Sequence, residues 1–550
     1  MPTITLNLKD LRRLIGFDLE LSTLQELLQA SKCGIENLCE EEAILEVTAD
    51  RPDLFSAEGI ARAIRNYVGK TVADHRKYLP KGSSGIEVLV SKDVKRIRPY
   101  IVCAVVKNVE LDEDAIKQIM QLQEKLHITY GLKRREASIG LYDLDKVSPP
   151  IIYEAKKPED IRFRPLDEKC EMSGKEILAQ TSKGIEYGWI ISSFDKYPLL
   201  RDAKGLVLSM PPIINSEETR VTTSTRNIFI DITGLSEKTL NQALAVLTAA
   251  LADRSGDIYS VKVNYGDKEI NTPVNISKRL EVNTSYIERV LGISTHPKML
   301  EEMLVKMGYE VVKSNENSVS CITPPYRVDI IGEIDVIEDV AIAYGYGNFE
   351  PEYPPIATIG KLHKKSIFGR KLREIMVGLG FQEIYTYVLS SRNIALQLNK
   401  LNEAVKLGNP VSSEYEILRC DLTLKILQFL SLNKHLEHPQ KIFEYGDVVV
   451  LGRDGRPINE TRLACAISDF EVSFEDIQAV LFALLEGLRL EPKLEPWEGD
   501  VYIKGRCAKV FIDKYTNIPV DGWKYIEEIL QREVTPIGRS DMEEGSGKVI

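Results

Sequence analysis

The sequence predicts a multidomain protein of the α+β class, and three observations predict it. A chain of 550 residues is too long for one hydrophobic core, because a domain usually has roughly 100 to 200 residues. Hydrophobic residues make up 43% of the chain and charged residues 28%, which is the composition of ordinary globular domains. Short β-rich runs and helical stretches also alternate along the chain, with proline and glycine between them.

The composition argues against several other classes of protein. No segment reaches about 18 consecutive apolar residues, so we expect no membrane span. The N-terminus, MPTITLNLKDLRRL, lacks the basic start and the apolar middle of a signal peptide, and we expect a cytoplasmic protein. The eight cysteines form no C-x-x-C pair, which indicates neither a disulfide framework nor a thiolate zinc site.

The net charge of the chain limits how it could bind a nucleic acid. The formal net charge is −11, which does not favour unspecific affinity for a polyanion. Two basic stretches are candidates for local contact: residues 76–107, with eight Lys or Arg against two acids, and the run Lys133-Arg134-Arg135. The alternative is that both stretches are solvated surface.

Residues 1–85 are expected to form an α/β module. Apolar and polar residues alternate from Thr3 to Leu8, as in a half-buried strand, and a helix is expected around Leu24–Leu28. Further on, Pro52 fits the first turn of a helix and Asp50 fits a cap before it, since proline has no amide hydrogen and a short carboxylate accepts from free amides.

The next domain is expected at residues 86–265, as an α+β domain with a buried sheet. Apolar periodicity places its elements. The expected strands lie at 86–90, 100–106 and 228–232, and the expected helices at 113–127 and 238–252.

Two further domains are expected at 266–352 and 353–550, joined by the proline-rich stretch 350–355. The first is a compact piece, and the second is another large α+β domain with alternating helices and strands. In the compact piece we expect helices at 285–291 and 297–307, strands at 309–312 and 319–322, and a last helix after Pro324-Pro325.

An acidic stretch carries the first candidate site, which is a metal site. If residues 333–344 are helical, Asp335, Glu338 and Asp339 lie at i, i+3 and i+4 and share one face. Asp329 lies upstream and can fold back over the same face, and oxygen-only clusters suit Mg²⁺ or Ca²⁺. The alternative is an acidic face that is solvated or paired to arginine in another domain.

A second candidate site combines two strings of residues. Asp231 and Thr233 are two apart in a predicted strand, so their side chains project to the same side. The proline pair in 209–215 would hold Ser209 and Asn215 rigidly near by, which gives a small polar cavity without a histidine base, a cysteine nucleophile or a metal triad. Alternatively, these polar groups satisfy neighbouring backbone groups at a sheet edge.

Several common catalytic motifs are missing from the chain. Neither G-x-x-x-x-G-K-[ST], nor G-x-G-x-x-G after a strand, nor H-E-x-x-H, nor G-x-S-x-G occurs. These motifs carry phosphate binding, dinucleotide binding, zinc hydrolysis and serine hydrolysis respectively. The sequence therefore predicts no self-contained catalytic centre of these types.

Taken in order, the motifs resemble those of the phenylalanyl-tRNA synthetase β subunits of the archaeal and eukaryotic type. The resemblance covers nearly the whole chain. It rests on E-V-T-A-D-R-P-D-L-F-S-A-E-G-I-A-R at 46–62, A-S-I-G-L-Y-D-L-D at 137–145, P-P-I-I-N-S at 211–216, F-I-D-I-T-G at 229–234 and P-P-Y-R-V-D-I-I-G-E-I-D-V-I-E-D-V-A-I-A-Y-G-Y at 324–346.

The resemblance implies a fold for each domain. Beyond the N-terminal module, it implies a B3/B4 domain that edits mischarged tyrosyl-tRNA at 86–265 and a B5 domain with a winged-helix-like fold at 266–352. It implies a class II synthetase-like domain, built on an antiparallel sheet and without activity, at 353–550. A live class II site needs arginines that clamp the ATP phosphates, and their usual G-x-G-x-x-R setting is absent. The stretch 510–550 departs from the expected pattern.

The resemblance also implies site residues. It assigns Mg²⁺ to the acidic helix, where the matching carboxylates are Asp329, Asp335, Glu338 and Asp339. It assigns editing to the polar cavity, where the matching residues are Ser209, Asp231 and Thr233, with Leu199 and Asn215 as further substrate-binding positions.

The function implied is that of a phenylalanine–tRNA ligase, which joins phenylalanine to tRNA(Phe) with ATP. Phenylalanine activation is expected on a separate α subunit in an (αβ)₂ heterotetramer, and editing of Tyr-tRNA(Phe) on this chain. Two alternatives keep the same fold: a non-catalytic tRNA-binding or interaction protein, and a free-standing aminoacyl-tRNA deacylase. Copurification with an α chain and hydrolysis of Tyr-tRNA separate them.

Overall fold

The computed structural model describes residues 2–69, 74–354, 356–498 and 502–515. The chain divides into two compact units, Met1–Glu352 and Tyr353–Ile550. In these described residues, no helix combines the length and the apolar composition needed to cross a lipid bilayer. The divergent stretch expected at 510–550 lies, from residue 516 on, outside the described residues.

The first unit begins with a small antiparallel sheet of strand order β1-β3-β2, packed against helices. Ile4 and Leu6 of β1 are buried while their neighbours are more exposed, as the alternation predicts. The elements, with 3₁₀ turns labelled η, are β1 (Thr3–Asn7), α1 (Leu8–Ile15), α2 (Leu21–Ala30), β2 (Cys33–Leu38), β3 (Glu42–Val47), η1 (Pro52–Leu54), α3 (Ala57–Tyr67) and η2 (His75–Tyr78).

The segment after β3 differs from its prediction. Pro52 begins a 3₁₀ turn of three residues, the helix α3 starts only at Ala57, and Asp50 caps neither of them. Arg51 donates to both carboxylate oxygens of Asp53, at 2.8 and 2.9 Å, inside the core. The turn lies so close to α3 that a Cβ at Gly59 would be 1.6 Å from the carbonyl oxygen of Asp53. The chain therefore turns before the helix can begin.

A ten-stranded mixed sheet forms the centre of the first unit. Its order is β12-β11-β10-β7-β4-β14-β5-β13-β6, with β15 paired to β14, and β4 is parallel to both of its neighbours. The strands predicted at 86–90, 100–106 and 228–232 are confirmed. The members are β4 (Ser83–Val90), β5 (Tyr100–Lys107), β6 (Ala137–Asp143), β7 (Ile151–Lys156), β10 (Tyr197–Arg201), β11 (Val207–Met210), β12 (Ile214–Asn215), β13 (Ile228–Gly234), β14 (Asp257–Asn264) and β15 (Glu269–Thr272).

Two long helices of this part, α4 and α7, match the predictions at 113–127 and 238–252. The remaining elements are short and sit in the connections between strands. The helices and connecting elements are η3 (Lys92–Arg96), α4 (Glu113–Ile128), η4 (Leu144–Lys146), β8 (Arg162–Phe163), β9 (Met172–Ser173), α5 (Gly174–Gln180), α6 (Ser182–Tyr187), η5 (Gly188–Ile190), η6 (Glu217–Thr219) and α7 (Glu237–Asp253).

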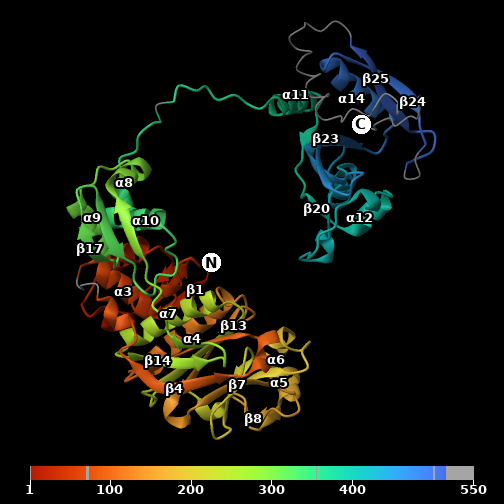
Figure 1. The fold of residues 1–550 in the computed structure, drawn as a ribbon. Coiled ribbons are helices and arrows are strands. Elements are labelled where there is room, and N and C mark those ends of the chain that lie inside the picture. The colour runs from red at the N-terminus through yellow and green to blue at the C-terminus, as the bar shows by residue number, and fades with distance from the viewer. Residues whose placement is uncertain (1, 70–73, 355, 499–501, 516–550) are drawn as a thin grey trace. The chain divides into compact units, whose positions relative to one another are not determined.

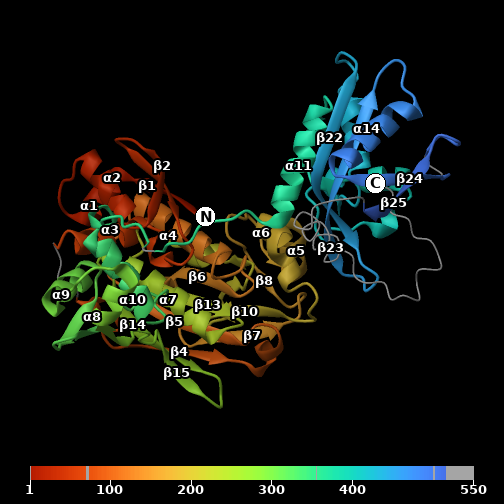
Figure 2. The same cartoon turned by 90° about the horizontal axis from the view of Figure 1, so that it is seen from above.

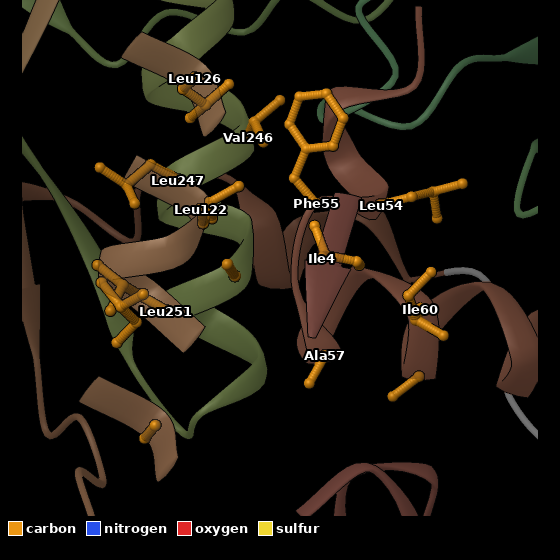
Figure 3. Close-up of a cluster of buried hydrophobic side chains, with 14 of the residues drawn as sticks. Ile4, Leu54, Phe55, Ala57, Ile60, Leu122, Leu126, Val246, Leu247 and Leu251 are labelled. Carbon is orange, nitrogen blue, oxygen red and sulfur yellow. The ribbon is translucent and has the colours of Figure 1, made fainter. Parts of the chain in front are cut away.

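The largest core of the first unit lies on one face of this sheet. The helices α4 and α7 lie between the sheet and the N-terminal module (Figures 1 and 2). Leu126 of α4 and Leu247 of α7 share one buried cluster with Ile4 and Phe55 of the module (Figure 3). Burying each such side chain stabilises the fold by roughly 1.5 to 3 kcal/mol relative to leaving it exposed. The module and the sheet are thus joined by a continuous core.

The opposite face of the sheet is where the candidate polar residues lie. Ile228, Ile230 and Ile232 of β13 enter the core below α4 and α7. Because side chains alternate along a strand, Asp231 and Thr233 project to the other face, which is lined by a second buried cluster. This confirms that the two polar side chains share one side of a strand.

The last part of the first unit is a small antiparallel sheet of order β16-β18-β17 with three helices. Its hydrophobic core is formed by side chains from the helices and from the sheet. Helix α10 has the predicted bounds. The elements are β16 (Arg279–Asn283), α8 (Thr284–Leu291), α9 (Pro297–Lys306), β17 (Glu310–Ser314), β18 (Ser318–Ile322), α10 (Glu333–Tyr344) and η7 (Tyr346–Asn348).

The second unit has several small sheets rather than one large one in its described residues. Their orders are β19-β22-β23, β20-β21 and β24-β25; β19 runs parallel to β22, and β22 antiparallel to β23. The elements are α11 (Lys364–Gly378), β19 (Gln382–Glu383), β20 (Leu389–Ser390), α12 (Arg392–Gln397), η8 (Leu401–Glu403), η9 (Ser413–Tyr415), β21 (Ile417–Leu418), α13 (Thr423–Leu432), β22 (Gln440–Leu451), β23 (Pro457–Ser468), α14 (Phe474–Gly487), β24 (Leu490–Pro496) and β25 (Ala508–Tyr515).

Candidate functional site

A buried tyrosine joins two of the predicted site residues. The Oη of Tyr142 on β6 lies 2.5 Å from Oδ1 of Asp231 on β13 and 2.8 Å from Oγ of Ser209 on β11. Asp231 and Ser209 are 1% and 2% exposed, and Tyr142 is fully buried. Asp231 and Tyr142 come from the neighbouring strands β13 and β6 at one end of the sheet order, whereas Ser209 comes from β11 near the other end. We call them the Tyr142 cluster.

A glycine makes this arrangement possible. Gly140 lies directly across from Asp231 in the pairing of β6 with β13. A Cβ at position 140 would lie 2.1 Å from Oη of Tyr142 and 2.3 Å from Oδ1 of Asp231, which is far inside van der Waals contact. The Tyr142 phenol therefore reaches Asp231 only because residue 140 has no side chain.

The carboxyl group of Asp231 has an unusual protonation equilibrium. Burial raises its pKa from 3.8 to about 7, although the hydrogen bond from Tyr142 and the charge of Arg98 act in the opposite direction. Burial is the dominant cause because removing a carboxylate from water disfavours its charged form. At neutral pH the group is therefore divided between its acid and its carboxylate, so it can donate or accept a hydrogen bond.

Thr233 is held by a buried arginine. Arg98 donates from Nε to Oγ1 of Thr233 at 3.0 Å and from Nη2 to its carbonyl oxygen at 2.6 Å. Ser138, the cross-strand neighbour, lies 3.0 Å from the same hydroxyl. Burial lowers the pKa of Arg98 to about 10, so the guanidinium stays charged at neutral pH. The Thr233 hydroxyl is fixed rather than free to rotate.

The other two predicted residues lie differently. Asn215 is the cross-strand partner of Ser209, because the turn through Pro211 and Pro212 brings β12 back along β11. Leu199 is buried, but it packs in a separate hydrophobic cluster with Phe163 and others. The structure thus brings Ser209, Asn215 and Asp231 together and sets Thr233 two residues further along β13, whereas Leu199 belongs to the other cluster.

The chemistry open to the Tyr142 cluster is limited. Its members offer hydroxyl and carboxyl groups, which can orient a phenol, a water molecule or an ester by hydrogen bonding. Cys103 lies across from Asp231 on β5, but burial and the neighbouring carboxylate raise the pKa of its thiol well above the usual value. The thiol stays protonated and is a poor nucleophile.

The four acidic residues of the predicted metal site are held by three different sets of partners. Asp329 and Asp339 both pair with Arg327, at 2.7 and 2.8 Å. Glu338 pairs at 2.8 Å with Lys32, which lies between α2 and β2. The remaining one, Asp335, accepts from the backbone amides of Ile331 and Gly332 at the start of α10.

This arrangement differs from one shared ligand set. Asp339 is 1% exposed and accepts from Oη of Tyr309 at 2.6 Å, whereas Glu338 points to a different partner. Within the described parts of the chain, no three His, Cys, Asp or Glu side chains come close enough to hold a metal ion. A buried carboxylate needs a counter-charge, and Arg327 supplies it from the same motif. The arginine belongs to the same domain as the helix, whereas the alternative interpretation placed it in another domain.

Sequence reasoning missed four residues of the candidate site. Tyr142, Gly140 and Ser138 all lie in the string 137–145, and their spacing of two would place them on one face of a strand. Arg98 was counted in the basic stretch 76–107 as a surface residue, but it is 2% exposed. Its position between two apolar neighbours in sequence gives no signal of burial, because basic residues are rarely fully buried.

Comparison with family models matches three regions of the chain. Residues 97–250 match the B3/4 domain, residues 280–346 match the tRNA synthetase B5 domain, and residues 350–519 match the phenylalanyl tRNA synthetase beta chain CLM domain. The Tyr142 cluster lies in the first region, and helix α10 in the second.

Curated relatives cover almost the whole chain. A phenylalanine–tRNA ligase beta subunit of Thermococcus sibiricus is 40% identical over 528 residues, which is 93% of this chain and 93% of the relative. The same protein of Pyrococcus abyssi is 41% identical over 525 residues, with 93% of each chain covered. A crystal structure of an N-terminal fragment of the phenylalanyl-tRNA synthetase beta subunit from Pyrococcus horikoshii has a TM-score of 0.60 and 43% identity, and covers 63% of this chain and 100% of the fragment.

Proposed function

Because the chain belongs to the phenylalanine–tRNA ligase beta subunit family, a component of an aminoacyl-tRNA synthetase, we propose that it works in a complex with an α subunit. In this proposal the complex is an (αβ)₂ heterotetramer in the cytoplasm. It converts ATP, phenylalanine and tRNA(Phe) into AMP, diphosphate and phenylalanyl-tRNA(Phe), with the chemistry of aminoacylation on the α subunit. The present chain contributes tRNA contacts, partner contacts and editing.

Editing of Tyr-tRNA(Phe) is assigned to the Tyr142 cluster and Thr233. The observation that carries this assignment is the buried set of Ser209, Tyr142 and Asp231 in the region that matches the B3/4 domain. A site that binds phenylalanine rejects an added hydroxyl only weakly, whereas a second site that hydrogen-bonds this hydroxyl selects for it strongly. The phenol oxygen of the misattached tyrosine is thus the group to be recognised.

Hydrolysis in this site depends on how the side chains position the substrate ester and a water molecule. The step adds water to the ester carbonyl and releases tyrosine from the 3′ end of the tRNA. Asp231 and Ser209 provide hydrogen-bond acceptors and donors for the substrate, and Asn215, next to Ser209, extends the same wall. We assign proton transfer to a positioned water and to the terminal hydroxyl of the tRNA, since the named residues include no histidine base.

The domain boundaries proposed are 1–85, 86–265, 266–352 and 353–550. The three-stranded antiparallel sheet with α8, α9 and α10 supports a winged-helix-like B5 domain.

For the last domain we propose a class II synthetase-like fold that has lost activity. In support, Arg419 is 3% exposed and donates to Glu444 at 2.5 Å, so its charge is already neutralised and is not available to ATP phosphates.

Mg²⁺ at the acidic helix is implied by the resemblance, but the residues present do not fit it well. A Mg²⁺ site in proteins uses one or more oxygen ligands that are free to coordinate. Here Arg327 pairs with both Asp329 and Asp339, and the other two carboxylates have other partners. The function proposed for this chain therefore does not depend on a metal at this helix.

The test is co-expression of the chain with an α subunit, followed by two assays on the purified complex. The proposal expects formation of Phe-tRNA and hydrolysis of Tyr-tRNA by one complex. Phe-tRNA formation without Tyr-tRNA hydrolysis would indicate a tRNA-binding subunit that has lost editing. Hydrolysis by the chain alone, with no association to an α subunit, would indicate a free-standing deacylase.

A further inference from the structure

A strained basic turn lies beside the candidate site. Leu132, Lys133 and Arg134 have φ angles of +46°, +56° and +66°. Residues with a Cβ rarely adopt this left-handed region, and almost never in a run of three. Such a conformation persists only where surrounding contacts hold it, and it occurs preferentially at functional positions.

The contacts that hold the turn lead to both sides of the candidate site. Arg134 donates from Nη1 to the carbonyl oxygen of Ile213 at 2.9 Å, in the turn between Ser209 and Asn215. The carbonyl oxygen of Arg135 accepts from Arg98 at 2.9 Å, and Arg98 is the residue that fixes Thr233. The turn is therefore a rigid extension of the site.

The same turn is tied to α6. The guanidinium of Arg134 lies 4.5 Å from the centre of the Tyr187 ring, and Lys183 lies 5.4 Å from the same ring. Tyr187 is buried and ends α6, and η5 follows directly. Helices α5 and α6 lie together at one end of the large sheet (Figures 1 and 2).

The surface that the turn, α6 and η5 expose to solvent is both basic and apolar. Leu132, Ile185 and Trp189 are 52%, 69% and 57% exposed. Lys133 and Arg135 are exposed as well, and in the part of the chain that the structure describes neither side chain makes an ion pair. Two acids near by are engaged in ion pairs, since Glu124 of α4 pairs with Arg134 and Glu186 of α6 with Lys183. We call Leu132, Lys133, Arg135, Ile185 and Trp189 the rim.

We infer that the rim binds a single-stranded RNA 3′ end and directs it to the Tyr142 cluster. Single-stranded RNA is bound by aromatic side chains that stack on bases and by Lys or Arg that contact the phosphates, and the rim offers both. A protein with a net charge of −11 attracts RNA only through such a local patch. The inference rests on the proposed function, because an aminoacyl ester must be carried to the site by the end of its tRNA.

The test measures RNA binding by the full chain. The probe is a synthetic RNA hairpin that copies a tRNA acceptor stem with its unpaired 3′ end, and the reference probe is the same stem without unpaired nucleotides. We expect K133A/R135A to weaken binding of the first probe about tenfold, and to lower the slope of log affinity against log salt by about 1.4, since each lost phosphate contact on a single strand removes about 0.7. The matched control K157A/K204A removes two exposed charges of the same domain and should change neither value.

A second variant tests the aromatic part of the rim. W189A should weaken binding of the unpaired 3′ end about five- to tenfold, because one stacked base is lost, while W189F should retain most of the affinity. Neither variant should change binding of the stem that lacks unpaired nucleotides. Equal affinity of wild type, K133A/R135A and W189A for the first probe would overturn the inference.

The readout separates this inference from the proposed function. Binding is measured without an ester, so it does not require hydrolysis. If Tyr-tRNA is hydrolysed but the rim variants bind the 3′ end as wild type does, only the rim assignment is wrong. If the rim variants lose binding but wild type hydrolyses no Tyr-tRNA, the rim assignment stands and the editing function is wrong.

Discussion

The phenol oxygen of Tyr142 lies 2.5 Å from Oδ1 of Asp231, in a position that Gly140 leaves open. The phenol of Tyr142 thus makes the hydrogen bond to Asp231 that the phenol of a tyrosine substrate would also make. The same phenol lies 2.8 Å from Ser209, so one side chain links both polar groups of the candidate site. This relationship makes the state of Asp231 depend on a residue of a neighbouring strand.

Removing the Tyr142 hydroxyl should disturb the site without opening a large cavity. Y142F leaves Asp231 and Ser209 buried without this partner, and an unsatisfied buried polar group costs about 1 to 3 kcal/mol. We expect a loss of stability of that size and a fall of about tenfold or more in the rate of Tyr-tRNA hydrolysis. Denaturant unfolding and a deacylation assay measure the two effects.

The matched control for this substitution is Y309F, because Tyr309 is also buried and donates to a buried aspartate, Asp339, at 2.6 Å. It should cost similar stability and leave hydrolysis unchanged. If both variants lowered hydrolysis equally, the effect of Tyr142 would be one of general stability and not of the site.

Adding one methyl group at position 140 should have a similar effect by a different route. In G140A the new Cβ would lie 2.1 Å from Oη of Tyr142, so the ring must move and its hydrogen bond to Asp231 must break. We expect a loss of about 1 to 3 kcal/mol, as for other overpacked cores, together with reduced hydrolysis. G82A, where nothing lies within 4 Å of the added atom, is the control, and a harmless G140A would contradict the observed packing.

The raised pKa of Asp231, about 7 against 3.8, predicts a pH dependence of stability. Between these values the folded state binds more protons than the unfolded state, so stability falls as pH rises. Between pH 5 and pH 7, the titration of this one group should lower the free energy of unfolding by about 2 kcal/mol. The measurement is the free energy of unfolding of wild type relative to D231N across this range. A difference that stays constant or grows in favour of wild type would refute the assignment.

The acidic helix should behave as an ion-pair element. Breaking a buried pair leaves an uncompensated charge, so D339A should cost about 3 to 5 kcal/mol. E338A removes a half-exposed pair with Lys32 and should cost less than about 1 kcal/mol. We also expect Mg²⁺ and chelator to leave the melting temperature of the wild type unchanged. Stabilisation by Mg²⁺ that disappears in D339A would show instead that these carboxylates bind the metal.

Strong local patterns were enough to predict much of the fold. The alternation of Thr3 to Leu8, the periodicity of 113–127 and 238–252 and the bounds of α10 all match the structure, because each segment buries one face whose period is visible in sequence. The start of a helix at Pro52 was wrong because the buried Arg51–Asp53 pair forms only when the chain folds. Local capping rules do not include such tertiary contacts.

The candidate site could be predicted only in part for the same reason. Asp231 and Thr233 follow from the period of one strand, but their partners Tyr142 and Arg98 come from distant positions. The spacing of Asp335, Glu338 and Asp339 suggested one acidic face, whereas the structure buries Asp339 against Tyr309 and leaves Glu338 at the surface. The i, i+3, i+4 spacing shows that the three carboxylates share one face of a helix. It does not reveal which of them pairs with an arginine.

The most direct test of the central claim compares two buried aspartates in one complex. Asp231 belongs to the Tyr142 cluster, whereas Asp202 is equally buried but accepts only backbone amides, from Ser148, Lys204 and Leu206. Hydrolysis of Tyr-tRNA(Phe) is measured for the α-subunit complex of wild type, D231N and D202N, with Phe-tRNA formation measured in parallel. The account predicts that D231N loses hydrolysis by about a hundredfold and keeps Phe-tRNA formation, while D202N keeps both. Hydrolysis by D231N at the wild-type rate would contradict it.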